Sequence, residues 1–180
     1  MRFRFTVGRK IGAGFGGLIV ATLLIFVLTF ITLMNSKSLN EDVNNIYVPT
    51  VAQLEDLNLL VVRSKMLIYN WVFVQSGPDN VNKQLLLRLV AEEYPGKKKE
   101  IERLEPYWKE EERLQMEGTF KTIDELLATH ILIMSQLSTF ESYEDAMIIF
   151  TVRPMVEGGE IDAQTDLALE KLAAAIDTHK

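Results

Sequence analysis

The chain has 180 residues, of which 24% are charged, and its formal net charge is −6. This acidic balance argues against nucleic acid and anionic lipid headgroups as partners of its polar part. The absence of cysteine excludes disulfide bonds and thiol chemistry, so apolar packing must stabilise the fold.

A helix that crosses a membrane is predicted over residues 11–34, after a basic segment at residues 1–10. Its 24 residues carry no charge, and at about 1.5 Å per residue they reach roughly 36 Å, enough for a hydrocarbon core of about 30 Å. It lacks the polar face that the core helix of a soluble domain would show. A cleavable signal peptide is the alternative, but its apolar region is only about 7–15 residues long and ends at a small-residue cleavage site. We therefore predict an uncleaved anchor.

The charges around this span predict its orientation. Four basic residues precede it, and no acidic residue occurs before Glu41. Basic residues remain on the cytoplasmic side of a membrane span, so we expect residues 1–10 in the cytoplasm and residues 35–180 outside it. The outer part then carries 15 of the 19 basic side chains and all 25 acidic ones, which again disfavours nucleic acid.

Gly12 and Gly16 form a G-x-x-x-G pattern at the start of the span. Small residues at this spacing let two membrane helices approach closely, which would bring two copies of the chain together. The alternative is that these glycines reflect only the frequency of glycine in membrane helices. The first interpretation predicts a homodimer that forms through the membrane span and the first helix.

Residues 35–180 are expected to form an antiparallel four-helix bundle, so the predicted fold class is all-α. Turn signals at Ser76–Asp79, near Pro106 and at Arg153–Gly159 divide this part into four amphipathic segments. Two short connections and one longer one suit an antiparallel bundle. The apolar stretch AMIIFTV at residues 146–152 lies in the long connection. We expect a short helix there; a buried strand is the alternative, although nothing else in the chain could pair with it.

Apolar side chains at helical spacing predict the side of each segment that faces the core. In the first segment, which Pro49 is expected to kink, this side comprises Leu54, Leu57, Val61, Ser64, Ile68 and Trp71. In the second it comprises Leu87, Val90, Tyr94, Ile101 and Leu104. In the third it comprises Met116, Phe120, Ile123, Leu127, His130, Met134 and Leu137. In the fourth it comprises Leu167, Leu169, Leu172 and Ala175.

A second, mixed stripe on the first segment supplies the candidate ligand-binding residues Arg63, Met66 and Asn70. Arg63 and Asn70 are two helical turns apart and share a face. A guanidinium at this place could bind a carboxylate ligand through two hydrogen bonds. The alternative is that Arg63 pairs with an acidic residue of a neighbouring helix or lies in solvent, because an unpaired buried arginine is rare.

No residue pattern indicates an enzyme, a metal site or a cofactor site. His130 lies on the apolar side of the third segment without a second histidine or any cysteine, so we expect a hydrogen-bonded core histidine rather than a metal ligand. No serine–histidine arrangement indicates nucleophilic catalysis. The GAGFGG stretch is similar to a phosphate-binding loop only superficially, because it opens a membrane span and no strand precedes it.

Three stretches carry a resemblance to a known family. Residues 10–33 read KIGAGFGGLIVATLLIFVLTFITL, residues 44–72 read NNIYVPTVAQLEDLNLLVVRSKMLIYNWV, and residues 100–130 read EIERLEPYWKEEERLQMEGTFKTIDELLATH. In layout and composition the chain resembles the four-helix-bundle sensor region of bacterial methyl-accepting chemotaxis proteins and related transmembrane sensor proteins. The resemblance rests on layout rather than on an invariant motif, and it covers nearly the whole chain.

The resemblance implies a dimeric receptor in the bacterial inner membrane. Its ligand, a small molecule or a protein, would bind near the dimer interface, and a small helix shift would then cross the membrane. In the family a second membrane helix, a HAMP linker and a cytoplasmic output domain follow the bundle, so we expect the 180 residues to be a fragment of a longer receptor. The alternative from another functional class is a membrane-tethered helical scaffold that binds a partner protein without signalling.

Overall fold

The computed structural model describes residues 7–77 and 79–179, and within these ranges the chain forms only helices and the turns that connect them. The predicted all-α class is confirmed. The chain divides at Asn45 and Ile46 into two compact units, which are considered separately.

The first unit contains the helix α1, Val7–Asp42. Within it, Ile11–Lys37 is long and apolar enough to cross a membrane, and it is the only such helix among the described residues. Its side chains are exposed rather than packed against other parts of the chain. The Thr22 and Thr32 hydroxyls donate hydrogen bonds of 2.9 Å to carbonyl oxygens one turn earlier, so both are satisfied within the helix.

A π-helical turn at Val43–Tyr47 precedes α2, Val48–Phe73. Pro49 lies in the first turn of α2, directly after this π-helical turn. Proline lacks a backbone N–H, and an irregular turn beside it accommodates the missing hydrogen bond.

The segment predicted as the second helix forms α3, Val81–Arg88, a π-helical turn at Leu89–Glu93, and α4, Tyr94–Glu102. Asn80 caps α3, because its side chain accepts a hydrogen bond of 2.9 Å from the Asn82 backbone N–H. A 3₁₀ turn at Glu105–Tyr107 follows α4.

The remaining chain forms α5, Glu110–Gln136, a 3₁₀ turn at Glu141–Tyr143, α6, Ala146–Val156, and α7, Glu160–Thr178. Three glutamates occupy the first turn of α5, where the helix dipole favours acidic side chains. The Asp145 side chain caps α6 by accepting from the backbone N–H groups of Met147 and Ile148. The apolar stretch at residues 146–152 is thus a helix, and the strand alternative is excluded.

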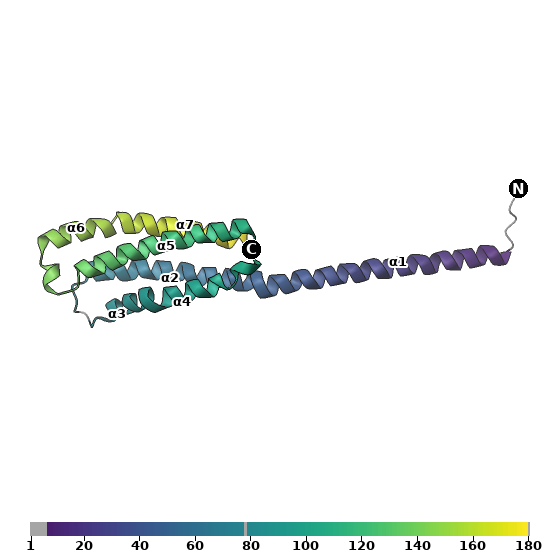
Figure 1. The fold of residues 1–180 in the computed structure, drawn as a ribbon, viewed down its shortest axis with the longest axis horizontal. Coiled ribbons are helices and arrows are strands. Elements are labelled where there is room, and N and C mark those ends of the chain that lie inside the picture. The colour runs from purple at the N-terminus through teal and green to yellow at the C-terminus, as the bar shows by residue number, and fades with distance from the viewer. Residues whose placement is uncertain (1–6, 78, 180) are drawn as a thin grey trace. The chain divides into compact units, whose positions relative to one another are not determined.

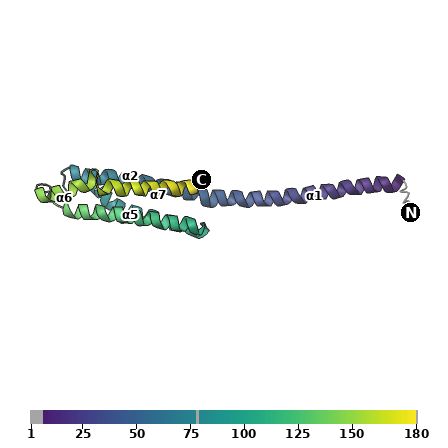
Figure 2. The same ribbon diagram turned by 90° about the horizontal axis from the view of Figure 1, so that it is seen from above.

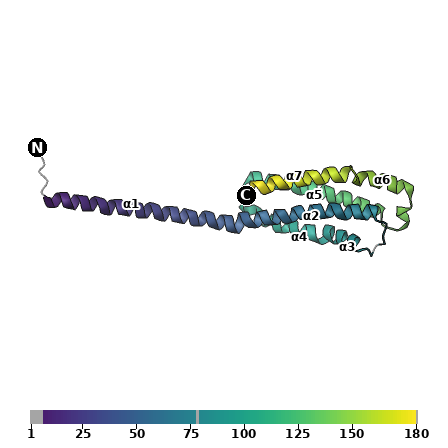
Figure 3. The ribbon, with the colours of Figure 1, turned by 180° about the vertical axis from the view of Figure 1, so that it is seen from behind.

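Helix α2 contacts every other long helix of the second unit, and α5 and α7 pack against each other along their lengths. In Figure 1, α3 and α4 follow one another along one side of α2, and α6 and α7 follow one another along the other. Figure 3 shows the same neighbours from behind, and Figure 2 shows α5 running beside α7.

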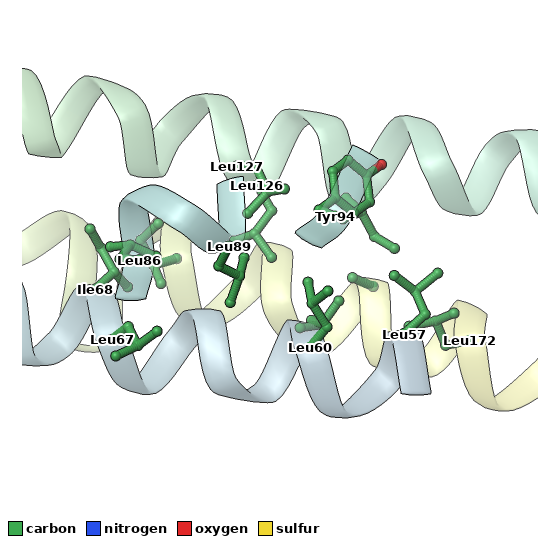
Figure 4. Close-up of a cluster of buried hydrophobic side chains, with 14 of the residues drawn as sticks. Leu57, Leu60, Leu67, Ile68, Leu86, Leu89, Tyr94, Leu126, Leu127 and Leu172 are labelled. Carbon is green, nitrogen blue, oxygen red and sulfur yellow. The ribbon is translucent and has the colours of Figure 1, made fainter. Parts of the chain in front are cut away.

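The apolar core lies where α2, the α3–α4 segment, α5 and α7 meet (Figure 4). All six residues predicted to face the core from α2 are buried, as are all seven predicted from α5. Two predictions were wrong: Leu87 is 43% exposed and Leu167 is 46% exposed. Leu86 and Ala168, their next neighbours, are buried instead.

His130 lies inside this core and is fully buried. Its Nδ1–H donates a hydrogen bond of 2.6 Å to the Leu126 carbonyl oxygen, and its Nε2 has no hydrogen-bond partner. The predicted hydrogen-bonded core histidine is therefore observed. Burial lowers the pKa of His130 below the ordinary value of 6.5, because a low-dielectric surrounding disfavours the imidazolium.

This lowered pKa predicts that acid destabilises the second unit. As the pH falls below about 6.5 the unfolded chain binds a proton at His130 and the folded chain does not, so the free energy of unfolding decreases. We expect a lower melting temperature at pH 5.5 than at pH 7.5, measured by circular dichroism on the full chain in detergent. In His130→Leu this difference should shrink; an unchanged difference would contradict the assignment.

Candidate functional site

Arg63, the charged residue of the predicted ligand-binding set, forms an ion pair across helices. Its guanidinium donates from Nη2 to the Glu93 carboxylate, which is supplied by the π-helical turn between α3 and α4. The side chains of the two residues are 46% and 31% exposed. Arg63 thus pairs with an acidic residue of a neighbouring segment, which is the alternative to ligand binding that the sequence left open.

Arg63→Ala is expected to change stability only slightly, because exposed ion pairs contribute about 0.2–1 kcal/mol. We predict that this variant alters a ligand response more than it alters the melting temperature. Thermal unfolding of the full chain gives the change in melting temperature, and a ligand-binding assay on the same variant gives the change in response. A large loss of melting temperature with an unchanged response would instead assign Arg63 to packing.

The other two predicted residues do not join Arg63 around one cavity. The Asn70 side chain accepts a hydrogen bond of 3.0 Å from the Asn82 amide, and the Met66 side chain is 66% exposed. Arg63 lines a surface hollow of about 420 Å³ together with Glu93 and Lys97. Lys97 is itself paired with Asp56 and Glu100, so the charges of this hollow largely neutralise one another. The ligand-binding role of Arg63, Met66 and Asn70 stays a prediction.

A second cavity, of about 450 Å³, lies between the α3 side of the unit and α5. We call it the Lys83 cavity, since Lys83 is the only charged residue that lines it. Its volume falls in the range of about 300–1,000 Å³ that is usual for small-molecule sites. The lining residues are Trp71, Lys83, Gln84, Leu87, Val90, Ala91, Ile131, Met134, Ser135 and Ser138.

Lys83 is 3% exposed, and it is the only buried lysine or arginine among the described residues. Its Nζ donates a hydrogen bond of 2.6 Å to the Ser76 carbonyl oxygen. The same atom lies 5.0 Å from the ring centre of Trp71 and 4.8 Å from that of Tyr143. No carboxylate of a described residue forms an ion pair with it. Burial lowers the pKa of Lys83.

The surroundings of Lys83 are held in place by backbone contacts. The Trp71 indole N–H donates to the Leu137 carbonyl oxygen at 3.1 Å, and the Tyr143 hydroxyl donates to the Trp71 carbonyl oxygen at 2.6 Å. Burial raises the pKa of Tyr143 to about 12, so this hydroxyl remains a donor at neutral pH. Both rings are therefore fixed around the ammonium group.

Sequence reasoning did not find Lys83. A signal was present, because Lys83 precedes Leu86 by three residues and so shares its helix face. That face is buried, but its direction is visible only once α3 is packed on α2.

A polar cluster joins α2 to the beginning of α7. The Asp162 carboxylate accepts hydrogen bonds from the Tyr69 hydroxyl at 2.8 Å and from the Gly158 backbone N–H at 2.8 Å, and it pairs with Lys65 at 2.7 Å. Lys65 and Tyr69 hold the pKa of Asp162 below its ordinary value. The cluster raises the pKa of Tyr69 to about 12, mainly through desolvation. The cluster ties α2 to the beginning of α7.

Within the part of the chain that the structure describes, no three histidine, aspartate or glutamate side chains gather in a way that could hold a metal ion. No family model, curated protein or solved structure matches the chain.

Proposed function

We propose that the chain is the extracytoplasmic sensory input region of a bacterial transmembrane signal-transduction receptor, held by α1 in the inner membrane with its N-terminus in the cytoplasm. The observation that carries this proposal is the exposed, apolar helix Ile11–Lys37, which is followed in the chain by a helical unit containing a cavity of ligand size. In this proposal α2, the α3–α4 segment, α5 and the α6–α7 segment are the four helices of an antiparallel bundle. The chain acts by binding and not as an enzyme.

The receptor is proposed to be a homodimer formed through α2 and the membrane span. Four apolar side chains of α2 spaced three, four and seven residues apart are exposed: Leu59, Val62, Met66 and Phe73. Exposed apolar side chains that repeat along one side of a helix are typical of an interaction surface. At Gly12 and Gly16 nothing of the same chain lies within 4 Å of an added Cβ, so a second span has room to approach.

Ligand binding would act on the membrane through α2. This helix contacts the α3–α4 segment and α5, and the Asp162 cluster ties it to α7. Displacements of about 1–2 Å at helix interfaces are a known switching mode. Because α2 follows the span in sequence, a shift of α2 is the proposed signal.

Cysteine cross-linking tests this proposal without background, since the chain has no cysteine of its own. Val20→Cys lies on the Gly12–Gly16 side of the span, and Leu18→Cys lies on the opposite side. In native membranes we expect Val20→Cys and Met66→Cys to form cross-linked dimers faster than Leu18→Cys. A panel of amino acids, organic acids and sugars is then added, and at least one compound should change the rate at Val20→Cys.

Dimers that form at Met66→Cys but respond to no compound would favour the tethered scaffold. Equal and slow cross-linking at all three positions would contradict the dimer.

A further inference from the structure

We propose that the Lys83 cavity binds a small organic monocarboxylate with an apolar body, which deepens the proposed sensory function and rests on it. The site lies between α3 and α5. Three features support it: the buried Lys83, the groups around its ammonium group, and the apolar lining of the cavity.

The ammonium group of Lys83 is buried without a carboxylate partner among the described residues. A buried ammonium group is unfavourable unless it is paired, because it loses the water that would otherwise hydrate its charge. Two aromatic rings, through cation–π contacts, and one carbonyl oxygen offset part of this loss. Of the three N–H donors of Lys83, the described residues use one in a hydrogen bond. An anion beside the ammonium group would supply the missing acceptors.

Other lysines at the edge of the core are less buried and have partners on the protein. Lys171 donates to the Gly118 carbonyl oxygen at 3.0 Å and to the Thr122 hydroxyl at 2.7 Å. Lys65, Lys97 and Lys98 each have a carboxylate partner within 3.1 Å. Their charges are already balanced by the protein itself. Lys83 is the buried cation left for an external anion.

The lining of the Lys83 cavity indicates the chemistry of the rest of the ligand. Leu87, Val90, Ile131, Met134 and the Trp71 ring make most of the cavity wall apolar. Ser135 and Ser138 add two hydroxyl groups and no charge. Such a wall suits a hydrocarbon or aromatic body, and a single cation suits one carboxylate.

The test uses the full chain in lipid nanodiscs, with benzoate, phenylacetate and hexanoate as probes and their neutral amides as controls. Binding is measured by isothermal titration calorimetry. We expect at least one carboxylate to bind at least about tenfold more tightly than its amide, because a hydrogen bond to a charged group is worth that much. Lys83→Met keeps the length of the side chain and should abolish this preference.

Two further variants locate the effect. Ala91 lines the cavity and is exposed, so Ala91→Trp should fold and should block the probes by filling the space. Lys99 is exposed in α4 and does not line the cavity; Lys99→Met removes the same charge and should bind as the unchanged chain does.

Absence of carboxylate binding, an unchanged preference in Lys83→Met, or unchanged probe binding in Ala91→Trp would each overturn the assignment. The outcomes separate it from the proposed function. Binding without any change in Val20→Cys cross-linking would remove the sensory role and leave the site. A compound of another class that changes the cross-linking while no carboxylate binds would leave the role and remove the site.

Discussion

Gly159→Ala is expected to destabilise the second unit by about 3 kcal/mol or more, at the upper end of the effects of overpacking. A Cβ at this position would lie 1.8 Å from the Pro154 carbonyl oxygen and 2.9 Å from the carbonyl group of Met155. Both neighbours are backbone atoms, so the junction between α6 and α7 would have to move. Chemical unfolding of the full chain in detergent, followed by circular dichroism, measures the change.

Gly118→Ala is the matched control for this substitution. Gly118 lies within α5, and nothing lies within 4 Å of an added Cβ. Alanine is the better helix former by about 1 kcal/mol, so this variant should be more stable than the unchanged chain. Two variants with the same effect would contradict the geometry of the α6–α7 junction.

Leu126→Ala should be the second large effect, a loss of about 2–5 kcal/mol in the free energy of unfolding. Leu126 is fully buried in α5 and points into the core between the helices (Figure 4). Its removal leaves a cavity that a close-packed interior fills only in part. Equilibrium unfolding under the same conditions gives the value.

Leu132→Ala makes the same chemical change on the same helix, at a side chain that is 48% exposed. A loss of under about 1 kcal/mol is expected there, as for most surface substitutions. If the two leucine variants were equally destabilised, the assigned core face of α5 would be wrong.

The sequence was most informative where the helices are long and regular. Helix α5 is 27 residues long, and all seven residues of its predicted core side, from Met116 to Leu137 at its C-terminal cap, are buried. Periodicity of this length leaves one orientation that buries the apolar side chains. The same reason accounts for the correct core side of α2.

The α3–α4 segment was predicted less well, because its register changes within the segment. A π-helical turn places one extra residue in the turn at Leu89–Glu93. Before that turn the buried residues are Lys83 and Leu86, the turn itself begins with the buried Leu89, and after it the buried residues are Tyr94 and Ile101. A constant helical period fitted through Tyr94 therefore selects Leu87 in place of Leu86.

The candidate site depends on packing between helices that are distant in sequence. Arg63 and Glu93 are 30 residues apart, and Lys83 gains its environment from Trp71 and Tyr143. Residue types on one helix indicate what a side chain can do, but they do not identify the partner that another helix supplies. The pairing of Arg63 and the cavity beside Lys83 therefore had to come from the structure.

The orientation of the chain across the membrane tests the proposed sensory role most directly, because that role requires residues 46–180 to lie outside the cytoplasm. Single cysteines at Thr6 and Lys99 are labelled in intact cells with a membrane-impermeant maleimide. We expect the chain to stay in the membrane after an alkaline wash, Lys99→Cys to react in intact cells, and Thr6→Cys to react only after permeabilisation. A chain released into the soluble fraction, or labelling of Thr6→Cys alone in intact cells, would contradict it.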